Sequence, residues 1–186
     1  MNKYYTLLTQ TGQAQLANAL ALDQPLALST LVLGDGNGAY QPPTEKQTAL
    51  VNKVWHGPIN AIARDSDNPN WLVIEAVVPE EVGGFTVREV GVLDDNDNLI
   101  AMGAYPETYK PQLVEGSGRD LYIRMILQIS NADQVELKID PAIVLATRRY
   151  VDDALAPVIN AQVRIATAGI RTMHRQIQLN DRLIGA

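Results

Sequence analysis

Residues 82–104 are the segment that most restricts how this chain can fold. Their sequence is V-G-G-F-T-V-R-E-V-G-V-L-D-D-N-D-N-L-I-A-M-G-A. Apolar positions alternate up to Val87 and resume at Val90 in the opposite phase. Because side chains switch faces at every residue of a strand, this slip predicts a β-bulge at Arg88-Glu89. Asp94 to Asn98 consists of residues that tolerate left-handed turn conformations, and a new apolar run follows. The segment predicts a bulged hairpin, and the hairpin alone indicates no function.

Length and composition predict a folded, globular chain. It has 186 residues, of which 46% are apolar and 19% charged, enough for one domain with a sizeable core and an appended element. No window approaches the roughly 18 to 20 uninterrupted apolar residues of a membrane span, and no basic-then-apolar signal opens the chain, so we expect no membrane insertion. The absence of cysteine excludes disulfides, thiolate catalysis and cysteine-based zinc sites.

Charge divides the chain into two parts. Residues 1–146 hold 9 basic and 18 acidic residues, a net charge of −9, whereas residues 147–186 hold 6 arginines and 3 aspartates, a net charge of +3. An acidic body repels a phosphate backbone, so we expect no nucleic-acid partner. The change of sign predicts a boundary between a head domain, 1–146, and a second domain, 147–186.

The head reads as one helix and several strands. Residues 9–22 are rich in alanine, with Thr9 or Thr11 available as the N-cap, and predict a helix. Residues 49–63 are interrupted by a Gly-Pro pair and predict two short strands or one bent strand. Residues 106–118 contain proline, tyrosine and glycine and predict a long loop. We expect further strands at 26–33, 71–78, 119–130 and 135–139, of which the nearly all-apolar 71–78 is central and buried. About seven strands after one helix indicate a mostly antiparallel α+β head.

After residue 155 the apolar period becomes that of a coiled coil. Apolar residues recur at the a and d positions of four heptads, which as a helix would extend about 40 Å. A helix that packs on its own domain usually shows a broader apolar stripe, so self-association is the preferred interpretation over packing on the head. The predicted oligomer seam consists of Ala156, Ile159, Val163, Ala166, Ile170, Met173, Ile177, Asn180 and Ile184.

The sequence carries no enzyme signature. The glycines of L-G-D-G-N-G at 33–38 do not have the spacing of a phosphate-binding loop and no helix follows them, so they predict a tight turn. The histidines are His56 and His174, and no serine lies in a nucleophile-elbow sequence. The acidic turn at 94–98 lacks the glycine and glutamate of an EF-hand loop. We expect no catalysis, no cofactor and no metal.

One set of acids leaves an enzyme hypothesis open. Glu80, Glu81 and Glu89 are close in sequence, and paired carboxylates are what glycan hydrolysis requires. Adjacent glutamates at the start of a strand are far more often solvated, and nothing in the sequence fixes their separation. A glycan hydrolase is therefore the third hypothesis.

Several segments together resemble the N-terminal domain of phage tail-collar fibre proteins, as found in contractile-tailed phages of the P2 and Mu kind and in R-type bacteriocins. The resemblance covers roughly residues 4–153 and depends on the order and spacing of its motifs. The motifs are L-T-Q-T-G at 8–12, L-G-D-G-N-G at 33–38, T-A-L-V-N at 48–52, V-I-E-A-V-V-P-E-E-V-G-G-F at 73–85, R-E-V-G-V-L-D at 88–94, L-I-A-M-G at 99–103, Y-K-P-Q-L-V-E-G-S-G-R at 109–119 and A-T-R-R-Y-V-D-D at 146–153.

The resemblance implies a structural protein of a virion or a phage-tail-like particle, made in the cytoplasm of the host bacterium. In such a fibre three copies associate, the N-terminal domains dock on a baseplate wedge protein, and distal regions recognise the host. The chain departs from the family at Thr86 and Val87, where an aromatic residue commonly follows the phenylalanine. It also ends at Ala186 without collar repeats, so we expect either part of a longer fibre or a short adaptor that joins a distal fibre protein.

The runner-up hypothesis is a carbohydrate- or receptor-binding module of a tail particle. In that reading, Tyr105 and Tyr109 beside the predicted loop 106–118 would stack on a sugar. Aromatic residues make up only 5% of the chain, so the sequence gives this hypothesis less support.

Overall fold

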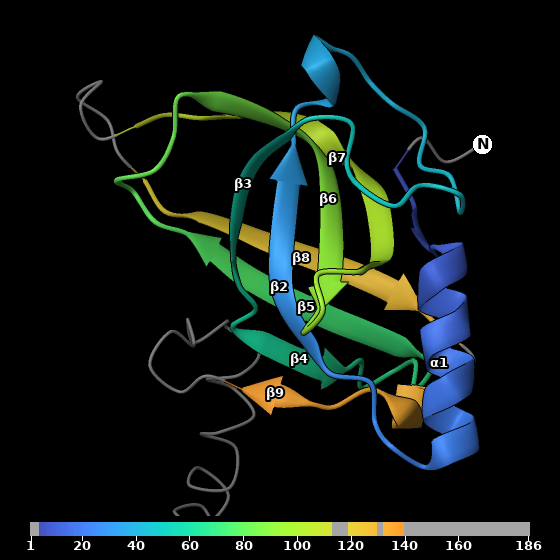
Figure 1. The fold of residues 1–186 in the computed structure, drawn as a ribbon. Coiled ribbons are helices and arrows are strands. Elements are labelled where there is room, and N and C mark those ends of the chain that lie inside the picture. The colour runs from blue at the N-terminus through green and yellow to red at the C-terminus, as the bar shows by residue number, and fades with distance from the viewer. Residues whose placement is uncertain (1–3, 113–118, 130–131, 140–186) are drawn as a thin grey trace, which may run out of the picture. The chain divides into compact units, whose positions relative to one another are not determined.

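The computed structural model describes residues 4–112, 119–129 and 132–139, and its strands form two antiparallel sheets (Figure 1). The five-stranded sheet has the order β1-β7-β6-β2-β3. Its strands are β1 (Thr6–Leu8), β2 (Leu28–Gly34), β3 (Lys53–Pro58), β6 (Phe85–Asp94) and β7 (Leu99–Lys110). The four-stranded sheet has the order β8-β5-β4-β9. Its strands are β4 (Ala61–Arg64), β5 (Trp71–Val78), β8 (Leu121–Gln128) and β9 (Lys138–Ile139). The predicted mostly antiparallel β head with an N-terminal helix is confirmed.

The hairpin of β6 and β7 is the centre of the larger sheet. Its register shifts between Val87 and Glu89, which confirms the predicted bulge. The shift turns both Val87 and Val90 toward the core, while Glu89 faces the opposite side. Asp97 closes the turn with a φ of 61°, the left-handed conformation expected of this Asp/Asn segment.

The Gly57-Pro58 pair carries the chain from one sheet to the other. It ends β3 in the five-stranded sheet, and β4 begins three residues later in the four-stranded sheet. Between them Asn60 is buried, and its Oδ1 accepts a hydrogen bond of 2.9 Å from the Val77 N–H. The two-strand alternative for residues 49–63 is therefore the one that the structure adopts.

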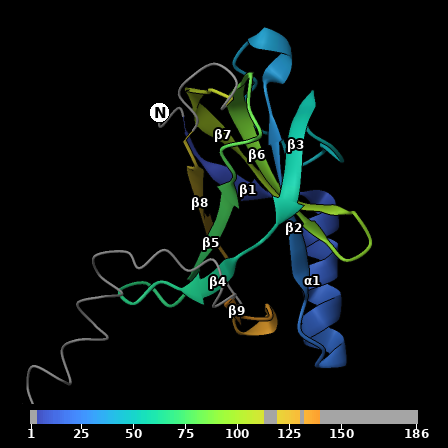
Figure 2. The ribbon, with the colours of Figure 1, turned by 90° about the vertical axis from the view of Figure 1, so that its left-hand side faces the viewer.

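The main core lies between the two sheets. The strands of the smaller sheet run across β2 and β6 in Figure 1, and Figure 2 shows the pair of sheets from the side. Each sheet contributes alternate residues, as the period of two requires. The five-stranded sheet contributes Leu31, Leu33, Val90 and Val92, and the four-stranded sheet contributes Ile62, Leu72, Ile74, Ile123, Met125 and Leu127.

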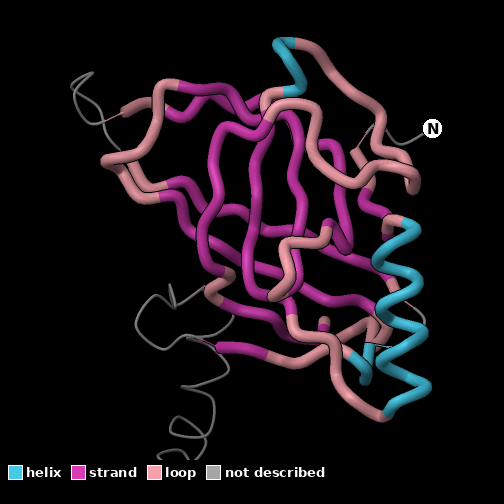
Figure 3. The backbone as a smooth tube through the Cα atoms, in the orientation of Figure 1, coloured by secondary structure: helices cyan, strands magenta, loops and turns pink. Residues whose placement is uncertain are grey.

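Residues 39–52 cover part of the outer face of the larger sheet. This long connection leaves the Gly36–Gly38 turn and returns to β3, as the loop tube in Figure 3 shows. Leu50 packs with Val32, Leu99 and Met102 in a second apolar cluster. The larger sheet is thus buried on both faces at its centre.

Helix α1 (Gln10–Leu22) packs against β7, and the contact explains why Gly12 is a glycine. The Thr9 hydroxyl caps the helix by accepting a hydrogen bond of 3.0 Å from the Gly12 N–H, and it also donates one of 2.5 Å to the Leu99 carbonyl. The Thr9 N–H donates to the Ile100 carbonyl at 3.0 Å. A Cβ added at Gly12 would lie 2.0 Å from that carbonyl oxygen. The predicted helix and its Thr9 cap are confirmed.

Three expectations differ from the structure. Strand β7 continues to Lys110, so the first part of the predicted loop 106–118 is strand, because residues 108–110 pair with residues 85–87 of β6. The strand predicted at 135–139 is reduced to Lys138–Ile139, because Val135 instead bridges Leu26 after a 3₁₀ turn. Strand β1 was not expected at all. It has three residues, and its pairing with β7 defines it.

The boundary near residue 147 and the C-terminal coiled coil fall outside the described residues. Both remain predictions. Among the described helices, none combines the length and the apolar character that crossing a membrane requires.

Replacing Gly12 by alanine should destabilise the head. The new methyl group cannot fit beside the Ile100 carbonyl unless α1 moves away from β7, and forced overpacking of this kind costs about 1–3 kcal/mol or more. Urea unfolding monitored by circular dichroism measures the loss. Gln13→Ala, at an exposed position of the same helix, is the matched control and should change stability by less than about 0.5 kcal/mol. Equal stability of Gly12→Ala and wild type would show that the helix does not lie this close to β7.

Candidate functional site

Residues of two quoted motifs, 33–38 and 48–52, meet at a tight turn that follows β2. Asp35 Oδ1 accepts hydrogen bonds of 2.8 Å from the Asn37 N–H and 2.8 Å from the Asn52 side-chain amide. The Asp35 N–H donates to the Asn52 carbonyl at 3.1 Å. Gly36, Asn37 and Gly38 all have positive φ, which explains the two glycines. The turn is a structural clasp between β2 and the start of β3, as the glycine spacing predicted.

Arg88 extends this clasp to β7. Its guanidinium lies 3.1 Å from the Glu107 carboxylate, and its Nη1 donates to the Asp35 carbonyl at 3.2 Å. Only 15% of the Arg88 side chain is exposed, whereas 68% of the Glu107 side chain is. Arg88 therefore ties the glycine turn to the β6–β7 hairpin from a mostly buried position.

Glu89 lies on the outer face of the larger sheet and is 1% exposed. Its Oε1 accepts a hydrogen bond of 3.3 Å from the Val51 N–H. Within the described part of the chain, its Oε2 has no hydrogen-bond partner. A Cβ at Gly34 would lie 2.6 Å from Oε2, so the glycine of β2 leaves room for this carboxylate. Glu89 is enclosed beneath residues 50–52 and does not face a cleft where a substrate could bind.

The other two glutamates of the hydrolase hypothesis do not join Glu89. Glu80 and Glu81 lie on the loop between β5 and β6, where the Glu81 carbonyl accepts a hydrogen bond of 3.1 Å from the Gln112 side chain. Their positions on a loop and a buried strand give no arrangement of two carboxylates around a shared cleft. The geometry therefore offers no support for glycan hydrolysis.

A further buried charge, Lys110, lies where β7 ends. The residue is 1% exposed, and its ammonium donates to the Pro111 carbonyl at 3.1 Å. The backbone nearby is crowded, since a Cβ at Gly83 would lie 2.4 Å from the Pro111 oxygen, and the Gly84 N–H donates to the Lys110 carbonyl at 2.8 Å. The Gly-Gly pair and the Y-K-P motif, far apart in sequence, thus form one contact.

The acidic turn after β6 uses its first carboxylate internally. Asp94 accepts hydrogen bonds from the N–H groups of Asn96 and Asn98 and from the Asn98 side chain, at 2.8, 2.9 and 2.9 Å. No cluster of three or more acidic or histidine side chains able to hold a metal ion occurs among residues 4–112, 119–129 and 132–139. His56, the histidine of the head, lies exposed on β3.

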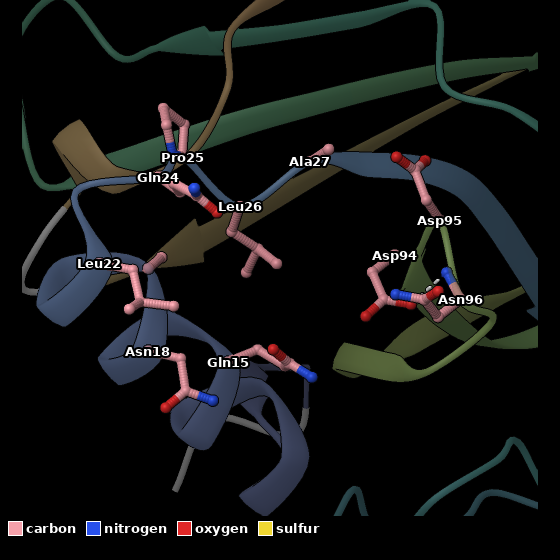
Figure 4. A pocket seen from close by; sticks show the side chains of 11 residues that line it. Gln15, Asn18, Leu22, Gln24, Pro25, Leu26, Ala27, Asp94, Asp95 and Asn96 are labelled. Atoms are coloured by element: carbon pink, nitrogen blue, oxygen red, sulfur yellow. Dashed lines mark hydrogen bonds between the residues drawn. The ribbon is translucent and has the colours of Figure 1, made fainter.

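The hollow in Figure 4 lies between α1, the segment that follows it and this acidic turn. It has a volume of about 280 Å³ and is lined mainly by polar side chains, including Gln15, Asn18, Gln24, Asp95 and Asn96. Leu22 borders it and is 67% exposed. No aromatic side chain lines the hollow, so it lacks a stacking surface for a sugar ring.

The tyrosines of the receptor-binding hypothesis lie on strand β7 instead of a loop. Tyr105 packs against the main core, and desolvation by burial raises the pKa of its phenol. Tyr109 is 54% exposed. A third tyrosine, Tyr122 on β8, has its pKa raised by desolvation, and next by the Asp120 carboxylate, to which its hydroxyl donates at 3.3 Å. Burial of Tyr105 leaves Tyr109 without the paired platform that the hypothesis required.

The oligomer seam from Ala156 to Ile184 lies outside the described residues. Sequence reasoning found the Thr9 cap but missed the bonds that tie Thr9 to β7 and the structural roles of Asn52 and Lys110, although each residue belongs to a quoted motif. Thr9 donates to the Leu99 carbonyl, 90 positions away, and Asn52 donates to Asp35, 17 positions away. The Lys110 carbonyl accepts from the Gly84 N–H, 26 positions away, so no local pattern could reveal these contacts. The presence of these residues in the quoted motifs was the one sequence signal that pointed to their importance.

Comparison with known proteins decides what these motifs mean. The family model described as "Phage tail-collar fibre protein, N-terminal" matches residues 1–149. The chain belongs to this family. Among curated proteins, the "Probable tail fiber protein" of Escherichia phage P2 is 43% identical over 155 residues, which is 83% of this chain. The alignment spans only 23% of that relative, so the similarity concerns one part of a much longer protein. No solved structure matches the chain.

Family membership agrees with the geometry of the motif residues. The residues of the quoted motifs, from the Thr9 cap to the Arg88 clasp, hold secondary-structure elements of the described head together. By family, the chain thus belongs with phage tail fibre proteins.

Replacing Glu89 by glutamine tests whether this carboxylate is purely structural. Glutamine keeps an oxygen acceptor for the Val51 N–H and replaces the unpaired carboxylate oxygen by an uncharged but equally enclosed amide NH2, so the free energy of unfolding should change by less than about 1 kcal/mol. Glu89→Ala should lower it by about 2 kcal/mol or more, because it leaves a cavity and an unpaired N–H. Urea unfolding at pH 7 compares the three proteins. A larger loss for glutamine than for alanine would contradict this account.

Proposed function

We propose that this chain is the attachment part of a tail fibre: the head, residues 1–146, anchors the fibre to the baseplate of a contractile tail, and residues 147–186 join three copies. The observation that carries the proposal is the family match over residues 1–149 together with the similarity to a tail fibre protein. The partners would be a baseplate wedge protein, two further copies and a distal fibre protein. The location would be the tail of a phage or a phage-tail-like particle.

The contacts of the head support a structural role without catalysis. Several of its buried polar residues serve turns, caps and strand connections, as Asp94, Asn60 and Thr9 show. Such a network keeps a small β head rigid, which suits a domain that transmits force between a fibre and a tail. No group of three or more side chains able to hold a metal ion is assembled among the described residues.

The trimer rests on the heptad of the second domain. The a and d positions over four heptads are apolar except for Asn180, and such a seam is buried by association in coiled coils. The β-branched residues at a are compatible with two or three chains, and membership of a fibre family favours three.

Changing Ile170 and Ile177 to aspartate should abolish association. Two carboxylates from each chain would lie in the seam, where like charges without partners are strongly unfavourable. Light scattering should give three times 20.3 kDa for the wild type and a single chain for the double variant. Circular dichroism should show that the β head stays folded.

Thr172→Asp with Gln178→Asp is the matched control, because it adds the same charge to the same predicted helix away from the seam. This control should remain trimeric. A double seam variant with the wild-type mass would overturn the stem part of the proposal.

The carbohydrate-binding alternative predicts a different result. Specific binding of the full chain to a glycan array, lost in Tyr109→Ala, would favour it. Binding to a purified baseplate wedge protein of a P2-like tail, with no glycan signal, would favour the attachment role.

A further inference from the structure

We propose that the outer face of the four-stranded sheet is the surface through which the heads of neighbouring copies contact one another. This inference rests on the proposed trimer and names the part of the head that takes part in it. The outer face is defined by the residues of β4, β5 and β8 that point away from the main core. They are Ala61, Ala63, Trp71, Val73, Glu75, Val77, Tyr122, Arg124, Ile126 and Gln128.

Strand β5 provides the first argument. It is a central strand of its sheet, and its inward residues Leu72, Ile74 and Val78 are fully buried. Its outward residues are also apolar except for Glu75. An antiparallel strand with one solvated face normally alternates apolar and polar residues, whereas a nearly continuous apolar run is typical of a strand covered on both faces. The sequence of β5 therefore fits a sheet that is covered on its outer face as well.

Strand β8 provides the second argument. Its outward residues Tyr122 and Ile126 are 47% and 41% exposed, so large apolar side chains on this face remain open to solvent in the single chain. They lie directly opposite Val77 and Val73 of β5, as two apolar pairs on either side of the Glu75–Arg124 pair, and Val73 is 7% exposed. The described helix, α1, packs mainly on β7 and does not shield this group. Large apolar side chains exposed together on one face of a sheet mark interaction surfaces.

Charge indicates that the partner is another copy of the chain. The head has a net charge of −9, so identical heads repel each other over most of their surface. The outer face is an exception, since it carries one acid and one base. Arg124 and Glu75 lie opposite each other with their charged groups 3.8 Å apart, a long contact between partly exposed side chains. Copies can meet here without like-charge repulsion, and the Arg124 of one copy can pair with the Glu75 of the next.

The course of the chain points to the same partner. The described part ends at β9, which is the other edge of this same sheet (Figure 1). Residues 140–186, with the predicted self-associating seam, continue from there. Association through those residues would keep the heads of three copies close to one another, and closed rings of three copies form through contacts between identical subunits.

Cross-linking of single-cysteine variants tests the inference, because the wild-type chain contains no cysteine. Three variants of the full chain are compared with a short bis-maleimide: Ile126→Cys on the outer face, Ile177→Cys in the predicted seam, and Leu20→Cys at an exposed apolar position of α1. We expect covalent links between chains for Ile126→Cys and Ile177→Cys and at least tenfold less for Leu20→Cys.

The three variants separate this inference from the proposed function. Links at Ile177→Cys with none at Ile126→Cys would leave the trimer standing and overturn the contact between heads. Links at Ile126→Cys alone would support the contact and reject the stem. No links at either position would reject both.

A second pair of variants tests how much the outer face contributes to trimer stability, and the reactivity of Ile126→Cys shows whether something else covers this face. Ile126→Glu should raise the dissociation constant of the trimer at least tenfold in light scattering against dilution, whereas Leu20→Glu should leave it unchanged. Unlinked Ile126→Cys that reacts slowly with a thiol reagent would show that the chain covers this face itself. Unlinked Ile126→Cys that reacts rapidly would show an open face awaiting another protein. Either result overturns contact between copies.

Discussion

The register of the β6–β7 hairpin is the constraint on which the rest of the head depends. Both β1 and β2 pair with this hairpin, so its register sets the alignment of the larger sheet. The bulge between Val87 and Glu89 lets two valines face the core and sends Glu89 to the other face. Without the extra residue, one of the two halves of β6 would present its polar residues to the core. This one extra residue therefore determines which residues of β6 face the main core and which face the opposite side of the sheet.

The same bulge explains why residues 33–52 are so restricted. Glu89 on the outer face is accommodated by Gly34, and its carboxylate binds the Val51 N–H. Arg88, the other residue between the two valines, reaches the Asp35 carbonyl and Glu107. Two adjacent residues of opposite charge therefore bind different partners around the bulge. The glycine turn, residues 39–52 and the β6–β7 hairpin therefore depend on one another for their positions. This dependence explains how the residues of a short motif can serve the fold.

A head built this way is suited to attachment more than to chemistry. The polar groups that look reactive in the sequence are occupied, as Asp94 is by its turn and Asp35 by Asn37 and Asn52. What remains available is surface: an acidic exterior, a polar hollow beside α1 and the apolar outer face of the four-stranded sheet. A tail fibre protein works through such surfaces, and their separation on the head would allow one to meet the tail and another to meet neighbouring copies.

The sequence by itself determined the local elements and the family. The apolar run at 71–78 predicted β5, and the period-two pattern at 119–130 predicted β8 to within two residues at each end. The Asp/Asn run predicted the hairpin turn, and Thr9 marked the start of α1. These features depend on neighbouring residues, so local patterns reveal them. Strand β1, the continuation of β7 to Lys110 and the near loss of β9 depended on partners distant in sequence. Only tertiary structure could also show that Glu89 is enclosed, that Tyr105 joins the core and that β5 keeps an apolar face outward. Burial and pairing are properties of the assembled sheets, because a strand has no inside until a second layer covers it.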